Sequence, residues 1–372
     1  HEDDWQLFMS SKIVADFNAA GKVVFITLTA GDAGNGDGSY SPGGAFFLSR
    51  ETGSVYSSKF VVDITNVAAP GPVPIITTVV VNGHNISKYV YGNAVNYFLR
   101  LPDGNQDGDG FPITGHKSLQ KLKLTQITSI SAVDNTATYT GWSDLTNTIV
   151  QIINNERGAD NQVWMYTADL HTGTNTGDHS DHLYAATAGQ DAVSALLWVG
   201  IAEFVDYASS GMAANLSDYD HENAAAIFNL SEWGLTEKQY ASNFDAGHKS
   251  WLPMDYFTTL RSPVGSAPFT NIENEKPALA EKLTAIPMIV SITAPVYIDK
   301  DVSMIVKKKK KGNLTTTIFN ERGESIFNLQ SVIGNKNATL INLGKVFTEK
   351  GTYKLVNVLN DKYIERRKIT VE

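Results

Sequence analysis

The sequence contains no cysteine among its 372 residues. This absence excludes disulfide bonds, catalysis by a thiolate and zinc sites built from cysteine. Any metal ion must therefore be held by histidine, aspartate, glutamate or backbone oxygen. The sequence also lacks a run of about 18 apolar residues, so we expect no segment that spans a membrane.

Basic residues are also scarce. The chain carries 30 Lys and Arg against 39 Asp and Glu, which gives a formal net charge of -9. A protein that binds nucleic acid needs a concentrated basic face, so this balance argues against a nucleic-acid partner and favours a neutral or cationic substrate. Apolar residues make up 42% of the chain, enough for well-buried cores in the two to three domains that its length indicates.

The charge is unevenly distributed along the chain. Residues 286–372 contain 15 Lys and Arg against 8 Asp and Glu, whereas residues 1–285 contain 15 against 31. Between the two parts, Pro263, Pro268 and Pro277 interrupt a segment rich in Ser, Asn and Glu, which is typical of a linker. We therefore predict two domains, 1–285 and 286–372.

The first part alternates strand-like and helix-like stretches. Continuous apolar runs with β-branched residues predict strands covered on both faces, as in a parallel sheet, and apolar residues spaced by four predict helices. The expected strands are 23–28, 96–101 and 163–167, and the expected helices are 9–17, 145–154 and 183 to about 207. This order is typical of an α/β fold with a mostly parallel sheet, in which ligands bind at the carboxyl ends of the strands.

The second part has a different pattern. Short apolar stretches at 288–292, 302–306, 315–319, 354–358 and 363–371 are separated by turn-forming residues such as those at 321–324. This spacing is typical of an antiparallel β-sandwich, and we predict an immunoglobulin-like module. The lysines at 307–311 form either a solvated hairpin end, which is the favoured interpretation, or a patch for an anionic surface.

Two short clusters contain the residue types of a metal site. Residues 1–4 read His-Glu-Asp-Asp, and residues 179–182 read His-Ser-Asp-His just before an expected helix. A catalytic divalent metal needs about three protein ligands and an open position for water. Of two neighbouring carboxylates, one can bind the metal while the other takes a proton from water. Two histidines at this spacing also occur by chance and then make surface or capping contacts.

These clusters, with the segments between them, resemble the PIG-L (LmbE-like) family of zinc-dependent N-acetylglucosaminyl de-N-acetylases. The matching stretches are residues 1–4 with the following helix, the strand and loop at 23–34, Arg-Glu at 50–51, Leu-Pro-Asp-Gly at 101–104, the cluster at 179–182 and a weaker echo at 248–250. The resemblance covers about residues 1–255. It implies a Rossmann-like, mostly parallel sheet flanked by helices.

The resemblance implies a role for the residues of the two clusters. His1, Asp4 and His182 would hold one catalytic zinc ion. Asp3 would be the general base that activates the metal-bound water.

It also implies roles for residues around the metal. His179, in its protonated form, would stabilise the oxyanion and help to protonate the leaving amine, with Asp181 orienting and charging its ring. Arg50 and Asp103 match positions that hold sugar hydroxyls. Substrate contacts are also expected from His248, through the family echo, and from His171, which follows a predicted strand.

The sequence departs from the family pattern at several positions. Glu2 and Ser180 stand where the family has proline, and Trp5 stands where it has glutamate. None of these changes removes a ligand. The ring of Trp5 can form a platform for a sugar or can lie in the core. Some members place a tyrosine at the position of Gly177, so Tyr166 is a candidate replacement here.

In the family the first motif follows a core strand, so the resemblance implies a strand, and any targeting peptide, on the amino side of His1. Read as an amino-terminal residue, His1 can instead chelate copper through its amine and ring, as in lytic polysaccharide monooxygenases. The order of the later motifs argues against this alternative.

Residues 103–110 resemble the first half of a calcium-binding loop. Asp103, Asn105, Asp107 and Asp109 offer oxygen ligands at alternate positions. The twelfth position is Thr114 rather than an acidic residue, so a complete EF-hand is not expected. Calcium in a looser loop and a solvated turn are the two interpretations.

These features predict a zinc-dependent hydrolase that removes the acetyl group from an N-acetylglucosamine-type amino sugar or glycoconjugate. The alternative is a non-catalytic carbohydrate-binding protein on the same fold, but the complete set of expected ligands and base favours the enzyme. The β-sandwich would dock to a glycan, a partner or a cell surface. The composition favours an exported protein, whether periplasmic, cell-surface or secreted.

Overall fold

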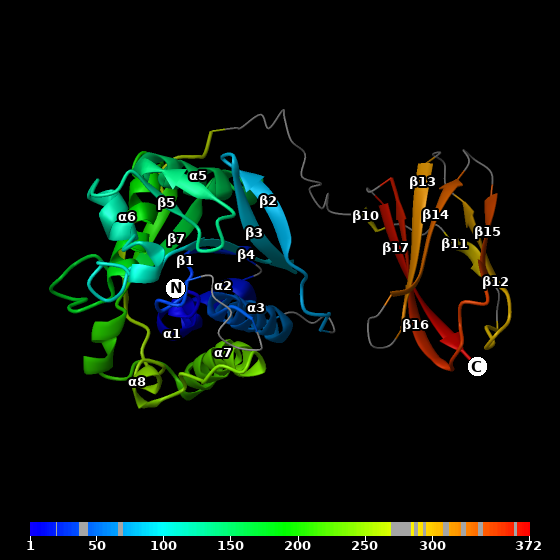
Figure 1. Cartoon of the computed structure of the whole chain (residues 1–372). Coiled ribbons are helices and arrows are strands. Elements are labelled where there is room, and N and C mark those ends of the chain that lie inside the picture. Colours follow the sequence, from blue (N-terminus) through cyan, green and yellow to red (C-terminus); the bar gives the residue numbers. More distant parts are fainter. Residues whose placement is uncertain are drawn as a thin grey trace. The chain divides into compact units, whose positions relative to one another are not determined.

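The computed structural model describes residues 1–19, 21–36, 44–65, 70–268, 284–285, 289–292, 295–307, 312–320, 325–333, 338–360 and 363–372. The chain divides into two compact units, His1–Phe269 and Thr270–Glu372 (Figure 1). The division falls on the amino side of the expected boundary at 285. Among the described residues, no helix combines the length and apolar character needed to cross a bilayer.

One sheet of the first unit has the strand order β1-β4-β3-β2. Its strands are β1 (Val23–Thr29), β2 (Thr77–Val81), β3 (His84–Tyr91) and β4 (Ala94–Leu101). β1 and β4 run parallel and confirm the strands expected at 23–28 and 96–101. β2 and β3 form an antiparallel hairpin through Asn82 and Gly83, which both have positive φ angles. Asn-Gly is a preferred sequence for such a turn, because both central residues adopt this conformation readily.

The second sheet has the order β7-β8-β9, formed by β7 (Val163–Ala168), β8 (Val199–Phe204) and β9 (Phe257–Arg261). β7 and β8 are parallel, and β9 is antiparallel to β8. β7 confirms the strand expected at 163–167. The helix expected from 183 to about 207 is confirmed only as far as Ala192, where α6 ends, and is wrong beyond it, because the following apolar run forms β8. Such a run suits a strand covered on both faces as well as a buried helix.

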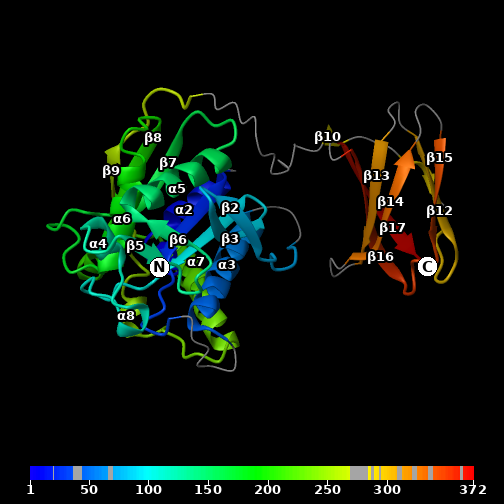
Figure 2. The ribbon, with the colours of Figure 1, turned by 45° about the horizontal axis from the view of Figure 1, so that its top comes forward.

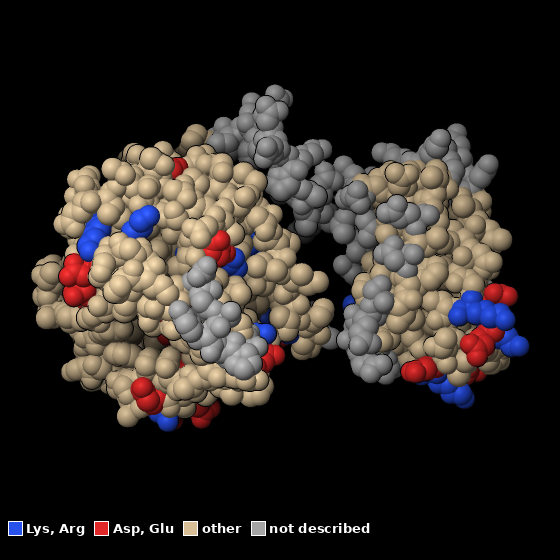
Figure 3. All heavy atoms as spheres, in the orientation of Figure 1, with Lys and Arg blue, Asp and Glu red and all other residues tan. Residues whose placement is uncertain are grey.

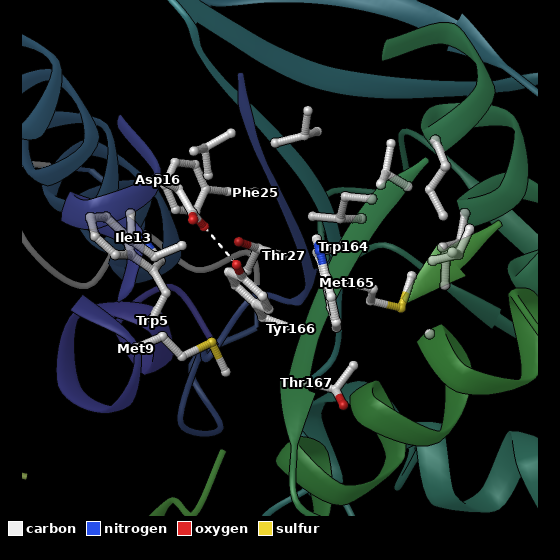
Figure 4. Close-up of a pocket in the computed structure, with 18 of the residues that line it drawn as sticks. Trp5, Met9, Ile13, Asp16, Phe25, Thr27, Trp164, Met165, Tyr166 and Thr167 are labelled. Carbon is white, nitrogen blue, oxygen red and sulfur yellow. Dashed lines mark hydrogen bonds between the residues drawn. The ribbon is translucent and has the colours of Figure 1, made fainter. Parts of the chain in front are cut away.

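The first unit is therefore α/β, but its sheets are mixed rather than mostly parallel. The expected Rossmann-like sheet is not continuous, because β1 and β7 are edge strands of separate sheets. A cavity of about 530 Å³ is lined by residues of both strands. Figure 4 shows Tyr166 of β7 on the side of Phe25 and Thr27 of β1, whereas Met165 points to the other side of β7.

Helices and short elements surround these two sheets. The helices are α1 (Asp4–Phe8), α2 (Ser10–Asn18), α3 (Phe46–Thr65), α4 (Leu119–Lys123), α5 (Gly141–Glu156), α6 (Ser180–Ala192), α7 (Asp218–Glu237) and α8 (Ala246–Lys249). Two 3-10 helices lie at Pro112–Thr114 and Tyr207–Gly211, and a small hairpin joins β5 (Ser129–Ser131) to β6 (Thr138–Thr140). α2 and α5 confirm the helices expected at 9–17 and 145–154.

Helices α3 and α7 pack side by side, as Figures 1 and 2 both show. Gly53 and Gly234 make this close approach possible, because a Cβ atom at either position would collide with backbone atoms of the other helix. The apolar core beneath them also includes Trp5 and Phe8 of α1. Burial of these two large side chains anchors α1, and with it the short segment that leads into the helix.

The second unit is a β-sandwich of two sheets, with strand orders β10-β17-β16-β13-β14 and β11-β12-β15. Its strands are β10 (Thr284–Ala285), β11 (Ile289–Ile292), β12 (Val302–Lys307), β13 (Gly312–Phe319), β14 (Ser325–Ile333), β15 (Ala338–Gly344), β16 (Gly351–Leu359) and β17 (Tyr363–Val371). Met304 and Ile341 from one sheet share a core with Leu314 and Leu355 from the other. The expected sandwich is confirmed, with β10, β14 and β15 as strands that no prediction covered. Residues 308–311 and 321–324 lie outside the described residues.

Figure 3 shows where charged side chains lie on one face of the protein. On this face of the first unit, the described Lys and Arg side chains are scattered, and several lie beside Asp or Glu. The face therefore offers no concentrated positive charge to a phosphate backbone.

Candidate metal centre

Residues from four segments of the first unit meet around His182. These segments are residues 1–4, which lead into α1, and the loops that follow β4, β7 and β8. Loops at the carboxyl ends of parallel strands gather at one edge of a sheet, which brings residues distant in sequence together. His182 lies in the first turn of α6, and its side chain is almost completely buried.

The Nε2 atom of His182 faces the two other residues that are expected to bind metal. It lies 3.3 Å from Nδ1 of His1 and 3.1 Å from Oδ1 of Asp4. Two ligands of a tetrahedral zinc ion, with bonds of about 2.0–2.2 Å, are about 3.3–3.6 Å apart. His182 therefore lies from each of the other two expected ligands at nearly the spacing that a shared metal ion requires.

Several overlapping sets of His and Asp side chains could hold a metal ion. Potential ligand atoms lie within 4.8 Å of one another in the sets His1, His179, His182; His1, Asp3, Asp4; His1, Asp103, Asp181; and Asp178, His182, Asp206. The first two sets contain the expected ligands and the expected base. We call His1, Asp3, Asp4, His179 and His182 the metal centre. Nε2 of His1 is buried there without a hydrogen-bond partner among the described residues.

Charges in the metal centre favour a cation. Burial alone would raise the pKa of Asp4, but the positive charge of His182 holds it well below its ordinary value. Burial would likewise lower the pKa of His182, but Asp4 and two further carboxylates hold it well above its ordinary value. A buried imidazolium among carboxylates marks a place where a metal cation can replace a proton.

Other acidic groups near the metal centre titrate close to neutral pH. Burial raises the pKa of Asp181 to about 7, and the charge of Asp103 adds to this rise. Burial also raises the pKa of Glu2 to about 8, although Arg50 opposes the rise. Carboxyl groups with pKa values shifted this far are common at functional sites.

Asp3, the expected base, is held by Arg50. Oδ1 of Asp3 forms an ion pair with Nη2 of Arg50, and Nη1 of Arg50 donates to the carbonyl oxygen of Gly31 at 2.8 Å. Nε of Arg50 lies 3.3 Å from Oε2 of the buried Glu2. The resemblance assigns Arg50 to sugar hydroxyls, whereas in the structure its guanidinium anchors Asp3. Gly31 permits this arrangement, because a Cβ atom there would collide with the guanidinium.

His179 forms the amino-terminal cap of α6. Its Nδ1 accepts the backbone N–H of Asp181 at 3.1 Å, so the hydrogen of a neutral ring lies on Nε2. Burial lowers the pKa of His179 below its ordinary value, although Asp181 opposes this shift. The contact at Nδ1 and the lowered pKa both favour a neutral ring over the protonated form that the resemblance implies. Asp181 does not orient that ring through its carboxylate, which accepts the N–H of Gly104 at 2.8 Å and lies 3.3 Å from Nε2 of His1.

Asp103 also faces the metal centre. Its Oδ2 atom lies 3.8 Å from Nε2 of His1, and its Oδ1 atom lies 3.9 Å from Nε2 of His179. Its oxygens accept the backbone N–H groups of Ala33 at 3.2 Å and Asn105 at 2.8 Å. These bonds fix the carboxylate at the edge of the site that is expected to bind the substrate.

The calcium-like sequence forms local turns. Oδ1 of Asp107 accepts the N–H of Asp109 at 3.0 Å, and Oδ1 of Asn105 accepts the N–H of Gln106 at 2.9 Å. Among the described His, Asp and Glu side chains, Asp107 and Asp109 belong to none of the sets that could hold a metal ion. Calcium in this loop therefore stays a prediction beside the local turns that the structure shows.

Three residues expected to contact substrate lie outside these ligand sets. Trp5 is only 6% exposed and packs against Phe25 in the core, where it also lines the cavity between β1 and β7. His171 is exposed in the loop after β7. His248 stacks on Phe228, with ring centroids 5.6 Å apart.

Tyr207 is an aromatic neighbour of the metal centre that no sequence signal indicates. Its ring centroid lies 5.1 Å from that of His182, and it stacks on Trp251 at 4.8 Å. Tyr166, the candidate from sequence, instead donates to Asp16 at 2.7 Å. Tyr207 and Asp206 follow β8, so correct assignment of that strand would have placed both at a carboxyl end.

No family model matches the chain, and no curated protein matches it. Similar solved structures include a CARDB domain from Pyrococcus furiosus in complex with two metal ions (15% identity, TM-score 0.16, 22% of this chain and 87% of that chain). Another is the sulfur carrier protein SoxY from Chlorobium limicola (14% identity, TM-score 0.18, 24% of this chain and 84% of that chain). A third is a superoxide reductase from Ignicoccus hospitalis (14% identity, TM-score 0.15, 22% of this chain and 78% of that chain). At these TM-scores the likenesses indicate neither a family nor a function.

Proposed function

We propose that the chain is a zinc-dependent hydrolase that removes the acetyl group from an N-acetylated amino sugar or its glycoconjugate. The observation that carries the proposal is the contact of His182 with both His1 and Asp4, with Asp3 and His179 in the overlapping sets of possible ligands that share His1. A protein that only binds a sugar needs no such set. The family resemblance, with its Rossmann-like core, supplies the substrate class and is part of the same proposal.

The donor set suits a catalytic zinc ion. His1, Asp4 and His182 would hold it through two imidazoles and one carboxylate, which leaves an open position for water or substrate. When bound, zinc acts as a Lewis acid and lowers the pKa of a bound water molecule to about 7.

The adjacent residues Asp3 and Asp4 would have different roles, Asp4 as a metal ligand and Asp3 as the general base. Asp4 faces His182, whereas Asp3 faces Arg50, so the two side chains point to different partners. Asp3 would accept the proton of the attacking water and then give it to the leaving nitrogen. Arg50 holds this carboxylate in one orientation throughout. The products are acetate and the free amine.

His179 would act as a neutral hydrogen-bond donor. Because its Nδ1 accepts the N–H of Asp181, its Nε2–H is available to the carbonyl oxygen of the substrate. A donor that is already aimed where negative charge develops stabilises the transition state more than the ground state. Asp103 lies close enough to this atom to contact the same part of the substrate.

The proposal also covers the charge of the substrate, the role of the β-sandwich and the location of the enzyme. A net charge of -9 suits a neutral sugar amide better than a phosphorylated substrate. The β-sandwich would dock to a glycan or a cell surface as an immunoglobulin-like module, and the enzyme would act outside the cytoplasm.

Acetate release from N-acetylglucosamine conjugates tests this function. The metal-free chain and the chain reloaded with zinc are compared, together with Asp3→Asn and the control Asp63→Asn, which removes a carboxylate paired with Lys59. We expect zinc-dependent release that falls by about 10²–10⁴-fold in Asp3→Asn alone. A zinc-loaded chain that binds the conjugates without releasing acetate would contradict the activity and indicate the binding protein.

A further inference from the structure

The side of His182 that faces away from the other metal ligands carries two more carboxylates. Nδ1 of His182 lies 2.8 Å from Oδ1 of Asp178 and 3.4 Å from Oδ2 of Asp206. Asp178 precedes α6 and Asp206 follows β8, and both are buried. His182 is therefore held at both ring nitrogens, with a different pair of neighbours at each.

Asn175 links the carboxylate of Asp178 to the backbone of Asp206. Its Nδ2 donates to Oδ2 of Asp178 at 2.7 Å and to the carbonyl oxygen of Asp169 at 3.0 Å. Its Oδ1 accepts the backbone N–H of Asp206 at 3.1 Å. Because Asn175 is itself buried, this link fixes the loops after β7 and β8 against each other beside His182.

The distances distinguish the two sides of the imidazole ring. The 2.8 Å contact with Asp178 is a hydrogen bond, and it is shorter than the separation of about 3.3 Å between two ligands of one zinc ion. The same Oδ1 atom of Asp178 also accepts the N–H of His179 at 2.8 Å. The neighbours of Nε2, at 3.1 and 3.3 Å, lie closer to the separation of two zinc ligands than Asp178 does.

We propose that Asp178 and Asp206 are positioning residues that keep the ring hydrogen of His182 on Nδ1 and direct its Nε2 to the metal. A neutral imidazole carries one hydrogen, so an acceptor at Nδ1 leaves Nε2 free as a ligand. A carboxylate partner also makes the ligating nitrogen more basic. Asp178 is the main partner because its contact is shorter. This inference rests on the metal centre of the proposed function.

Binding of Co²⁺ to the metal-free full chain tests the inference without an activity assay. The dissociation constant is measured by competition with a chromophoric chelator, and the visible absorption of bound cobalt reports the ligand geometry. Asp178→Asn keeps the side-chain shape but removes the charge, and we expect its Kd to rise about 10- to 100-fold. Asp206→Asn should give a smaller rise. Asp178→Ala should raise Kd at least as much as Asp178→Asn and should change the cobalt spectrum, because the ring is then free to turn.

Glu156→Gln is the matched control. Glu156 is a buried carboxylate that accepts hydrogen bonds from Lys22, Lys88 and Tyr97. Its replacement should lower the stability of the fold as the Asp178 variants do. It should leave the cobalt Kd and spectrum unchanged, which separates positioning from general loss of structure.

The outcomes separate the positioning role from the proposed function. Equal Kd values and spectra for wild type, Asp178→Asn and Asp178→Ala would overturn the positioning role and leave the function standing. A wild-type chain that binds neither Co²⁺ nor Zn²⁺ would overturn both. Should Asp178→Ala fail to fold, the comparison of Asp178→Asn with Glu156→Gln decides the question.

Discussion

Nε2 of His182 lies 3.1 Å from Oδ1 of Asp4, although the two residues belong to helices α6 and α1. Burial opposes a charge on either group, but each charge stabilises the other, so the pKa of Asp4 is lowered and that of His182 is raised. In the proposed function, a metal ion would compete with a proton for the space between these two side chains. Loss of either partner should therefore affect metal binding before it affects the fold.

Replacement of Asp4 tests this competition through stability. A ligand that binds only the folded chain stabilises it by about 2.7 kcal/mol when present at 100 times its Kd. Zinc should give wild type such a gain, and Asp4→Asn should lose most of it, because a neutral amide is a poor zinc ligand. Thermal unfolding with and without zinc measures the gain, with Asp63→Asn as a variant that keeps it. An undiminished gain in Asp4→Asn would remove Asp4 from the ligand set.

Replacement of Arg50 distinguishes an anchor of Asp3 from a contact to the substrate. Lysine keeps the charge but cannot reach Asp3 and the carbonyl oxygen of Gly31 together. We expect Arg50→Lys to lower kcat by about 10²-fold with little change in KM, because the base is then misplaced. Arg261→Lys, at an arginine bonded to backbone carbonyls beside β8, is the control. A raised KM with unchanged kcat would return Arg50 to the role that the family resemblance implies.

The burial of Trp5 leads to a prediction about stability rather than binding. Trp5→Ala should lower the free energy of unfolding by about 3–5 kcal/mol, as expected for a large core side chain. Trp5→Phe, which still fills much of the site, should leave KM for the sugar unchanged. Trp164 is 47% exposed, so Trp164→Phe should change stability by no more than about 0.5 kcal/mol. A large rise in KM for Trp5→Phe would favour the sugar platform instead of the core.

A buried carboxyl group away from the metal centre predicts a pH dependence. Burial raises the pKa of Asp255 to about 7, so the folded chain binds a proton more tightly than the unfolded chain does. Stability therefore falls as pH rises from about 4 towards 7, because the folded state must bury a charge. Asp255→Asn removes this dependence. The stability of wild type relative to the variant should drop by at least about 1 kcal/mol between pH 5 and pH 8. An unchanged difference in chemical denaturation at the two pH values would count against the shift.

Several elements follow directly from the sequence because local pattern and tertiary burial agree. β1 and β7 are apolar runs that end in polar loops, and the loop after β7 leads to the His-x-Asp-His cluster. The hairpin β2-β3 was also within reach, since Asn82 and Gly83 form a turn signal between alternating residues. These features depend mainly on neighbours in sequence.

Other features of the fold and of the candidate site depend on tertiary contacts that the spacing of residues in the sequence does not reveal. The segment of β8 is apolar throughout and therefore suits a buried helix or a buried strand, which hid Asp206 and Tyr207 at its carboxyl end. The sequence suggested candidate metal ligands, but the ion pair between Arg50 and Asp3 and the cap made by His179 are set by packing. The division of the first unit into two mixed sheets likewise reflects strand pairing, which local periodicity does not specify.

Anomalous diffraction at the zinc edge, from crystals of the zinc-loaded chain, tests the metal centre most directly because it locates the ion. We predict one peak within about 2.0–2.2 Å of Nε2 of His182, a ring nitrogen of His1 and a carboxylate oxygen of Asp4. A peak at Nδ1 of His182, between Asp178 and Asp206, would contradict the proposed ligand set. Crystals that contain no ordered zinc after loading would contradict the metal centre itself.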